Sequence, residues 1–313
     1  MFITSLLSGI TQRCNQRYLS NHEPRYEDWI PSALDETGIP QRIYQICLRG
    51  NQEDAETVLQ TLPDEVKNNI AHLKTNNPGW DYHLICDKEA ENFISTAFGE
   101  SILSYYRRID KRYGSARADL LRYLLLYQNG GVYLDLKSTL DKSLSNNLLN
   151  NDKFLLFYWD NVKGGNRHCL IPNYIEQGEI LQGFIISSPK HPFIRSVILQ
   201  VLSCIDHYNP YLDGIGWTGV LNTTGPALYT KTIYNEVSLA DTSQKKLYRA
   251  GRPFQDFGYK VNFYRDTTPG AYQKKLSFTD YRKQSVPVVI HPNALIDRIN
   301  RTYLRIMTSF KNR

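Results

Sequence analysis

Residues 115–135 read SARADLLRYLLLYQNGGVYLD, a leucine-rich run followed by two glycines and a short apolar segment that ends in an acid. Its leucine-rich part predicts a helix over residues 115–128. The Asn129-Gly130-Gly131 sequence predicts the end of that helix, because glycine readily adopts the left-handed conformation that terminates helices. Val132 to Asp135 consists of β-favouring residues followed by an acid, which predicts a short strand.

Strands and helices are expected to alternate on both sides of this stretch. The patterns predict strands at 42–48, 81–86, 132–135, 153–159, 180–187 and 286–290. They predict helices at 62–76, 88–97, 100–112, 115–128 and 192–206. Residues 160–166 are expected to form a loop, and residues 214–226 a connection rich in glycine and threonine. The alternation over residues 40–137 is typical of a parallel α/β sheet.

The chain has no internal repeat and no low-complexity linker, so we expect one compact unit over residues 39–313. Residues 1–38 are expected to form a peripheral N-terminal segment. Its start, MFITSLLSGI, has an apolar run too short to span a bilayer and lacks a basic region typical of a secretory signal. A short amphipathic helix is compatible with this start.

Composition and charge limit the classes of function. Hydrophobic residues make up 41% of the chain, as in a folded globular protein. The net charge of +6 is modest for 313 residues and is spread along the chain. We therefore expect no nucleic-acid partner. A mild excess of positive charge suits an anionic small ligand, such as a nucleotide diphosphate, or peripheral association with an anionic membrane surface. Five cysteines without a C-x-x-C spacing argue against a disulfide framework and a structural zinc site.

Three charged residues within residues 115–135 are candidates for a binding site. Asp119 and Arg122 are three positions apart on the predicted helix, so they share a face. Asp135 follows the predicted strand, and ligands of α/β sheets gather at the carboxyl ends of strands. A carboxylate that accepts sugar hydroxyls and a guanidinium that binds phosphate would make a donor-sugar site. The alternative is a surface ion pair between Asp119 and Arg122.

The same residues carry a resemblance to a known family, the DXD-containing glycosyltransferases. This family is typified by the yeast initiating α-1,6-mannosyltransferase, includes bacterial capsular polysaccharide sugar transferases, and has the large clostridial glucosylating toxins as distant relatives. The matching segments are IPQRIYQI at 39–46, NPGWDY at 77–82, ADLLRY at 118–123, GGVYLD at 130–135, SPKHPF at 188–193 and TGP at 224–226. The third and fourth segments resemble the family patterns S-D-L-x-R-Y and G-G-[IV]-Y-x-D-x-D, and together they are highly specific.

The resemblance implies a GT-A (Rossmann-like) nucleotide-sugar-binding fold with a mostly parallel central sheet. It further implies a nucleotide-sugar donor, a glycan or protein acceptor, and transfer with retention of configuration. Residues 39–150 would form the donor-binding half of the catalytic domain and residues 151–313 the acceptor half. The implied location is cytoplasmic or peripheral to a membrane, or the Golgi lumen in a eukaryote.

The resemblance also implies roles for individual residues. Asp119 would accept hydroxyls of the donor sugar, and Arg122 would bind the sugar or the diphosphate. Asp135 would bind a metal ion or the ribose–diphosphate region. Apart from the resemblance, Tyr133 lies two positions before Asp135 and is a candidate to line the donor cleft, with a simple core role as the alternative.

The chain departs from the family at the DXD motif, which reads Asp135-Leu136-Lys137. The second aspartate is replaced by lysine, which removes a ligand for a divalent cation such as Mn²⁺ or Mg²⁺. Two interpretations stay open. Either Lys137 itself neutralises the diphosphate, or Asp135 still holds the cation with help from another group. His291 is a candidate for that help, and its alternative role is to cap a turn before Pro292.

Lys137 also leaves a second functional class open. A catalytically impaired relative that only binds a sugar nucleotide or a glycan is the alternative to an active transferase.

Overall fold

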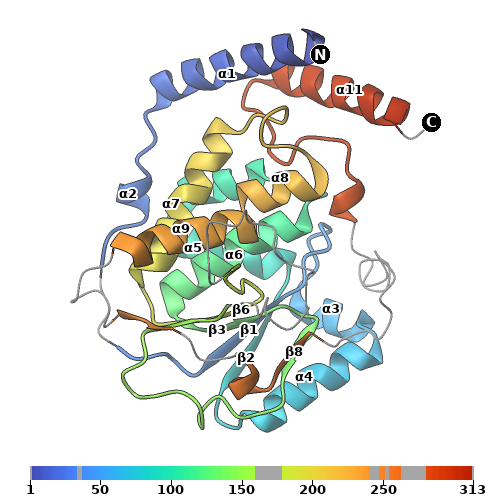
Figure 1. Ribbon diagram of the computed structural model, residues 1–313. Helices are drawn as coiled ribbons and strands as arrows, with labels where there is room; N and C mark the ends of the chain where they lie inside the picture. Colours follow the sequence, from blue (N-terminus) through green and yellow to red (C-terminus); the bar gives the residue numbers. More distant parts are fainter. Residues whose placement is uncertain are drawn as a thin grey trace.

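A six-stranded sheet forms the middle of the molecule (Figure 1). The computed structural model describes residues 2–33, 37–158, 178–239, 247–250, 254–261 and 280–311. The strand order is β2-β1-β3-β6-β5-β7, and the strands are β1 Arg42–Ile46, β2 Asp81–Ile85, β3 Gly131–Leu134, β5 Phe154–Leu156, β6 Phe184–Ser187 and β7 Arg249–Ala250. A separate pair consists of β4 Ser138–Leu140 and β8 Tyr259–Val261.

The pairing of the strands confirms the predicted α/β class with a mostly parallel central sheet. Strand β1 pairs in parallel with both β2 and β3, and β5 pairs in parallel with β7. Strand β6 is antiparallel to both β3 and β5. The parallel pairs β1–β2 and β1–β3 come from the stretch where helices and strands were predicted to alternate, because parallel neighbours need a crossover between them.

Helices cover both faces of the sheet. In Figure 1, α5 to α9 lie above the sheet, α4 lies below it at the lower right, and α3 lies to the right of it. The helices are α1 Phe2–His22, α2 Tyr26–Trp29, α3 Ala55–Thr61, α4 Asp64–Asn76, α5 Asp87–Arg108, α6 Gly114–Asn129, α7 Pro192–His207, α8 Gly216–Thr223, α9 Pro226–Leu239 and α11 Ala294–Lys311. Two short 3₁₀ turns, η2 Phe254–Phe257 and η3 Tyr281–Lys283, complete the described elements.

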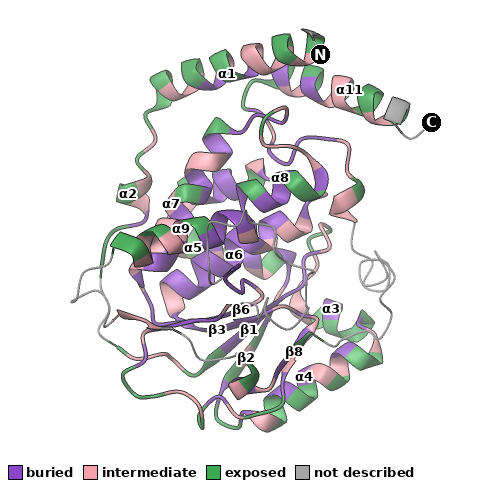
Figure 2. Ribbon diagram, viewed as in Figure 1, coloured by how far each residue is buried: buried purple, intermediate pink, exposed green. Residues whose placement is uncertain are grey.

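Helix α6 is the central helix of the upper layer, and it is buried on almost every side (Figure 2). Its leucines, from Leu120 to Leu126, are at most 2% exposed and belong to one core cluster with Tyr44 and Tyr133 of the sheet. Burying each such leucine stabilises the fold by about 1.5–3 kcal/mol. Charged residues of α6 are buried too, so each needs a partner inside the protein.

Two predicted elements differ from the structure near the upper layer. The helices expected at 88–97 and 100–112 are one helix, α5, with a kink at Gly99, where φ is 75°. The connection expected at 214–226 was wrong, since it contains α8 and the start of α9. Its glycines serve close packing rather than a loop, because a Cβ at Gly219 would lie 2.6 Å from the carbonyl oxygen of Gly214.

The strand expected at 286–290 was also wrong. Val289 forms a single bridge with Ile109, and the main chain on either side bonds to Arg108 and Asp110 at the end of α5. This segment therefore extends the helical layer and does not join the sheet. The loop expected at 160–166 lies outside the described residues.

The N-terminal segment 1–38 is helical for most of its length. Helix α1 contacts α7 and α11, and its Thr11 and Asn15 are buried against them. Ile30, just beyond α2, is fully buried in the upper core. Among the described helices, none is long and apolar enough to cross a membrane.

The turn between α6 and β3 yields a test of the fold. Gly130 has a φ of 62°, and a Cβ there would lie 2.6 Å from Cδ of Pro189 and 2.8 Å from Cδ of Pro40. We expect Gly130→Ala to lower the free energy of unfolding by about 3 kcal/mol or more, from a strained backbone and from overpacking. Urea unfolding measures this loss.

Gly79→Ala is the matched control for that substitution. Gly79 has a φ of 82°, but a Cβ added there would find no other atom within 4 Å. It should lose only the backbone part, roughly 1–2 kcal/mol. Equal losses in the two variants would contradict the packing argument.

Candidate active site

The guanidinium of Arg122 joins the three charged residues singled out in the sequence. Its Nη2 lies 3.0 Å from Oδ1 of Asp119, and its Nη1 lies 3.2 Å from Oδ1 of Asp135. The same Nη1 donates a hydrogen bond to the carbonyl oxygen of Gln182 at 3.1 Å. The ring of Tyr133 lies below the guanidinium, with its centroid 4.3 Å from Cζ. Helix α6 and the end of strand β3 thus meet at the guanidinium of Arg122, and the Asp119–Arg122 pair is buried rather than on the surface.

Asp135 occupies the end of β3, and it is the more open of the two carboxylates. Its side chain is 22% exposed, against 6% for Asp119. Tyr133 donates a hydrogen bond to its Oδ1 at 2.9 Å, and Nζ of Lys137 lies 3.4 Å from its Oδ2. Burial acts to raise the pKa of Asp135. The charges of Lys137 and Arg122 outweigh it, so the pKa is lower than usual and the carboxylate is ionised.

Gly183 allows β6 to approach Asp135 closely. Its carbonyl oxygen accepts a hydrogen bond from the Asp135 amide at 2.9 Å. A Cβ at Gly183 would lie 2.9 Å from Oδ2 of Asp135 and 3.2 Å from the hydroxyl of Tyr259. Any side chain here would displace the carboxylate, so this glycine keeps the space beside it open.

Asp119 is buried and has a partner on each oxygen. Arg122 contacts Oδ1, and the hydroxyl of Thr224 donates a hydrogen bond to Oδ2 at 2.9 Å. Burial raises the pKa of Asp119 to about 7, although Arg122 and Thr224 act in the opposite direction. The site therefore holds two carboxylates of different acidity on one guanidinium, an arrangement frequent at functional sites.

A polar network behind Asp119 holds the site together. Tyr123 donates a hydrogen bond to the carbonyl oxygen of Thr224 at 2.9 Å, and Nε2 of Gln182 donates to the same oxygen at 3.3 Å and to the hydroxyl of Tyr123. Sequence reasoning did not assign Gln182 or Gly183 to the site. Thr224 is part of the TGP segment that resembles the family, but that segment alone does not predict the hydrogen bond from Thr224 to Asp119.

The residues around Asp135 are a poor fit for a preformed divalent-cation site. The motif's second carboxylate is replaced by Lys137, whose ammonium occupies the side of Oδ2, while Arg122 and Tyr133 occupy Oδ1. Within the described residues, no group of three or more acidic, histidine or cysteine side chains could hold a metal ion. A cation placed there would meet two positive charges and one carboxylate.

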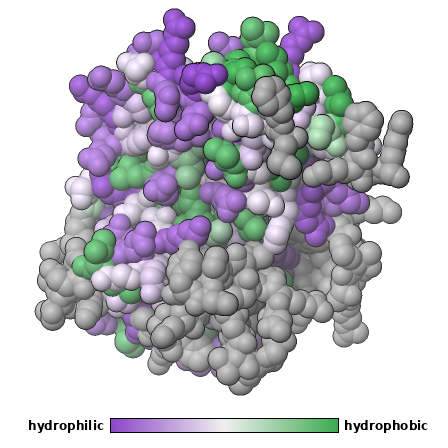
Figure 3. Space-filling model, turned by 45° about the horizontal axis from the view of Figure 1, so that its top comes forward, coloured by the Kyte–Doolittle hydropathy of each residue, from purple (hydrophilic) through white to green (hydrophobic). Residues whose placement is uncertain are grey.

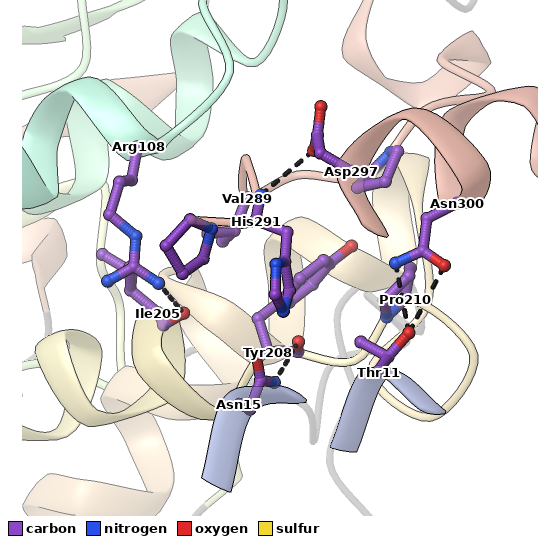
Figure 4. Close-up of a pocket in the computed structure, with 12 residues that line it drawn as sticks. Thr11, Asn15, Arg108, Ile205, Tyr208, Pro210, Val289, His291, Asp297 and Asn300 are labelled. Carbon is purple, nitrogen blue, oxygen red and sulfur yellow. Dashed lines mark hydrogen bonds between the residues drawn. The ribbon is translucent and has the colours of Figure 1, made fainter. Parts of the chain in front are cut away.

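His291 lies in a different part of the molecule (Figure 4). It lines a small cavity formed with α1, α7 and α11, and Asp119, Arg122 and Asp135 are not among the lining residues. Its Nδ1 accepts a hydrogen bond from the amide of Asn293 at 2.9 Å, which makes it a turn cap before α11. This placement does not support the predicted cooperation of His291 with Asp135 at a metal ion.

Comparisons with known proteins give distant relatives. An initiation-specific alpha-1,6-mannosyltransferase of Candida albicans is 23% identical over 179 residues, which cover 50% of this chain and 44% of that protein. An uncharacterised glycosyltransferase of Acanthamoeba polyphaga mimivirus is 26% identical over 65% of this chain and 71% of its own length. The chain thus spans less than half of the mannosyltransferase and more of the viral protein.

One solved structure, the PaToxG glycosyltransferase, superposes on 90% of this chain and 98% of its own with a TM-score of 0.45 and 14% identity. The family model of the "glycosyltransferase sugar-binding region containing DXD motif" matches residues 63–155. These residues run from the start of α4 to β5 and include Asp119, Arg122 and Asp135. Over this part, the chain is similar to the DXD-containing glycosyltransferase family.

Proposed function

We propose that this protein transfers a hexose from a nucleotide-sugar donor to a glycan or protein acceptor with retention of configuration. The observation that carries the proposal is the buried Asp119–Arg122–Asp135 cluster at the carboxyl end of β3. Removing three charges from water is unfavourable, and such clusters rarely serve stability alone. Because Asp135 and Lys137 are partly exposed, a ligand can reach the cluster.

The arrangement suits a sugar diphosphate. Asp119 and Asp135 supply acceptors for sugar hydroxyls, while Arg122 and Lys137 supply positive charge. The leaving nucleoside diphosphate gains negative charge as the glycosidic bond breaks, so fixed positive groups stabilise the transition state. We propose that Asp119 and Arg122 bind the donor sugar, that Tyr133 supports the guanidinium from below, and that Lys137 faces the diphosphate.

The sugar and the stereochemistry are finer parts of the proposal. The name of the Candida albicans relative makes a mannosyl donor the first candidate to test. Retention is supported by the resemblance to the retaining DXD family.

The site draws on both halves of the chain. Gln182 and Thr224, which hold Arg122 and Asp119, belong to residues 151–313, for which the sequence suggested an acceptor role. We therefore propose that the acceptor half also shapes the donor pocket. The single catalytic domain over residues 39–313 stays a prediction.

Asp135→Asn tests the assignment of the site. The variant keeps the side-chain shape but loses the charge, so we expect kcat for sugar transfer to fall by about 100-fold or more. The assay measures nucleoside diphosphate release from a panel of nucleotide sugars, with circular dichroism as a check of the fold. Asp110→Asn is the matched control, since Asp110 is paired with Arg301 away from the cluster.

Loss of activity in the control as well would show a general effect of removing a buried aspartate. Donor binding by the unmodified protein without any turnover would indicate the alternative, a binding relative. Activity of Asp135→Asn within a few-fold of the unmodified protein would refute the assignment.

Lys137 generates a second prediction, because it takes the place of a metal ligand. We expect part of the transfer activity to survive EDTA, since the ammonium already supplies positive charge. Lys137→Ala should lower kcat both with and without added Mn²⁺, while Lys137→Asp should give an enzyme that depends strictly on the metal. Complete inactivation by EDTA together with a harmless Lys137→Ala would show that a cation does this work.

Asp119 generates a prediction about stability and pH. An unfolded aspartate titrates near 4, whereas Asp119 titrates at about 7 in the fold. Between about pH 4 and about pH 7 the folded state therefore binds more protons at Asp119 than the unfolded state does. The free energy of unfolding consequently falls as pH rises, by about 4 kcal/mol at most. Asp119→Asn should remove that fall, which urea unfolding at about pH 5 and about pH 8 measures.

Asp135→Asn is the opposite case, because the pKa of Asp135 is lower than usual. Its ionised form stabilises the fold above about pH 4, and this contribution is lost as pH falls. Asp135→Asn should therefore lose stability at neutral pH. For Asp119→Asn, an equal change in the free energy of unfolding at about pH 5 and about pH 8 would contradict the raised pKa of Asp119.

A further inference from the structure

Helix α11 exposes an apolar stripe that nothing in the described chain covers. Leu295, Ile299 and Ile306 follow one another at helical spacing on one face, and they are 65%, 37% and 49% exposed. Met307 beside them is 39% exposed. Four large apolar side chains at the surface of one helix are unusual, because an amphipathic helix normally turns its apolar face to the core.

Helix α1 lies beside α11 and enlarges this surface (Figure 1). The two helices are joined by polar contacts: the hydroxyls of Thr4 and Tyr303 lie 2.8 Å apart, and Nδ2 of Asn300 donates a hydrogen bond to Thr11 at 3.2 Å. Thr11 and Asn15 of α1 point into the cavity in Figure 4, while two apolar residues near the start of the helix lie outside. Ile3 and Leu6 are 57% and 49% exposed.

Positive charge accompanies the apolar side chains. Helix α1 contains no acidic residue, and the one acid of α11, Asp297, is bound by Arg301. Each helix exposes two arginines: Arg13 and Arg17 on α1, and Arg298 and Arg305 on α11. Figure 3, with the top of the molecule turned forward, shows a hydrophobic area there next to strongly hydrophilic groups.

We propose that the face formed by α1 and α11, called here the helix-pair face, docks on an anionic lipid surface. Apolar side chains flanked by arginines are what a helix needs to lie in the interface of a membrane, with the apolar groups among the acyl chains and the guanidiniums at the headgroups. The inference is independent of the proposed sugar transfer, since the face shares no residue with the cluster around Arg122.

Charge favours lipid over a second copy of the chain as the occupant. A dimer through this face would bring the arginines of one copy toward those of the other, with only Asp297 on these helices to compensate. An anionic bilayer supplies negative charge over the whole face. Within the described helices none could cross the bilayer, so the contact would be with its surface.

Vesicle sedimentation with the full chain tests the proposal. We expect binding to phosphatidylcholine vesicles that contain phosphatidylserine, weak binding to pure phosphatidylcholine, and release at high salt. Arg298→Gln with Arg305→Gln should weaken binding by about 30-fold, from about fivefold per arginine near an anionic surface. Leu295→Ser with Ile299→Ser should also reduce binding several-fold, and because both side chains are exposed the thermal midpoint should barely change.

Matched controls lie elsewhere on the surface. Lys88→Gln with Lys231→Gln removes the same charge from α5 and α9, and Leu239→Ser changes an apolar side chain of α9 that is 82% exposed. These variants should bind vesicles like the unmodified protein. Equal binding to neutral and anionic vesicles, or equal loss in the controls, would overturn the proposal. A dimer in light scattering that dissociates in Leu295→Ser/Ile299→Ser, without vesicle binding, would replace lipid by a second copy.

Discussion

The bridge from Arg122 to Asp119 and Asp135 is the interaction on which the rest of the site depends. It ties the most deeply buried helix, α6, to the end of the central strand β3. Without the guanidinium, two carboxylates would face each other in a region of low dielectric, which is strongly unfavourable. The cation in turn is oriented by the Gln182 carbonyl and the Tyr133 ring, so its position is set by β6 and β3 together.

Close packing at the turn between α6 and β3 holds the two elements in place, while the side of the cluster at Asp135 is more open. Gly130 lets α6 reverse into β3 against two prolines, and Gly183 lets β6 approach the carboxylate of Asp135. The buried leucines of α6 pack against residues of the sheet and fix the position of the helix on it. The result is a closely packed cluster in which the side chains of Asp135 and Lys137 stay partly exposed.

The fold around Arg122 and Asp135 was largely predictable from sequence, because the sequence patterns that indicate α6 and β3 are local. The alternation of helical and strand-like hydrophobic patterns predicted the parallel strands, and the glycines after Asn129 predicted the end of α6 and the start of β3. The three-residue spacing predicted that Asp119 and Arg122 share a face. The second half was less predictable. Gly216 and Gly219 look like loop residues, but tertiary packing puts them in α8. Val286 to Ile290 looks like a strand, but α5 offers it only a single bridge.

His291 and Thr224 show why site residues are harder to predict than elements. A histidine after an apolar run resembles a metal ligand, yet its nearest donors here are the main chain of the next turn. Thr224 belongs to the site through a hydrogen bond whose two partners are 105 residues apart. Closing a loop of that length costs chain entropy, which the packing of the whole core offsets. Donor recognition should accordingly be a property of the complete tertiary structure alone, so ligand protection of the amides in α6 would report global rather than local unfolding.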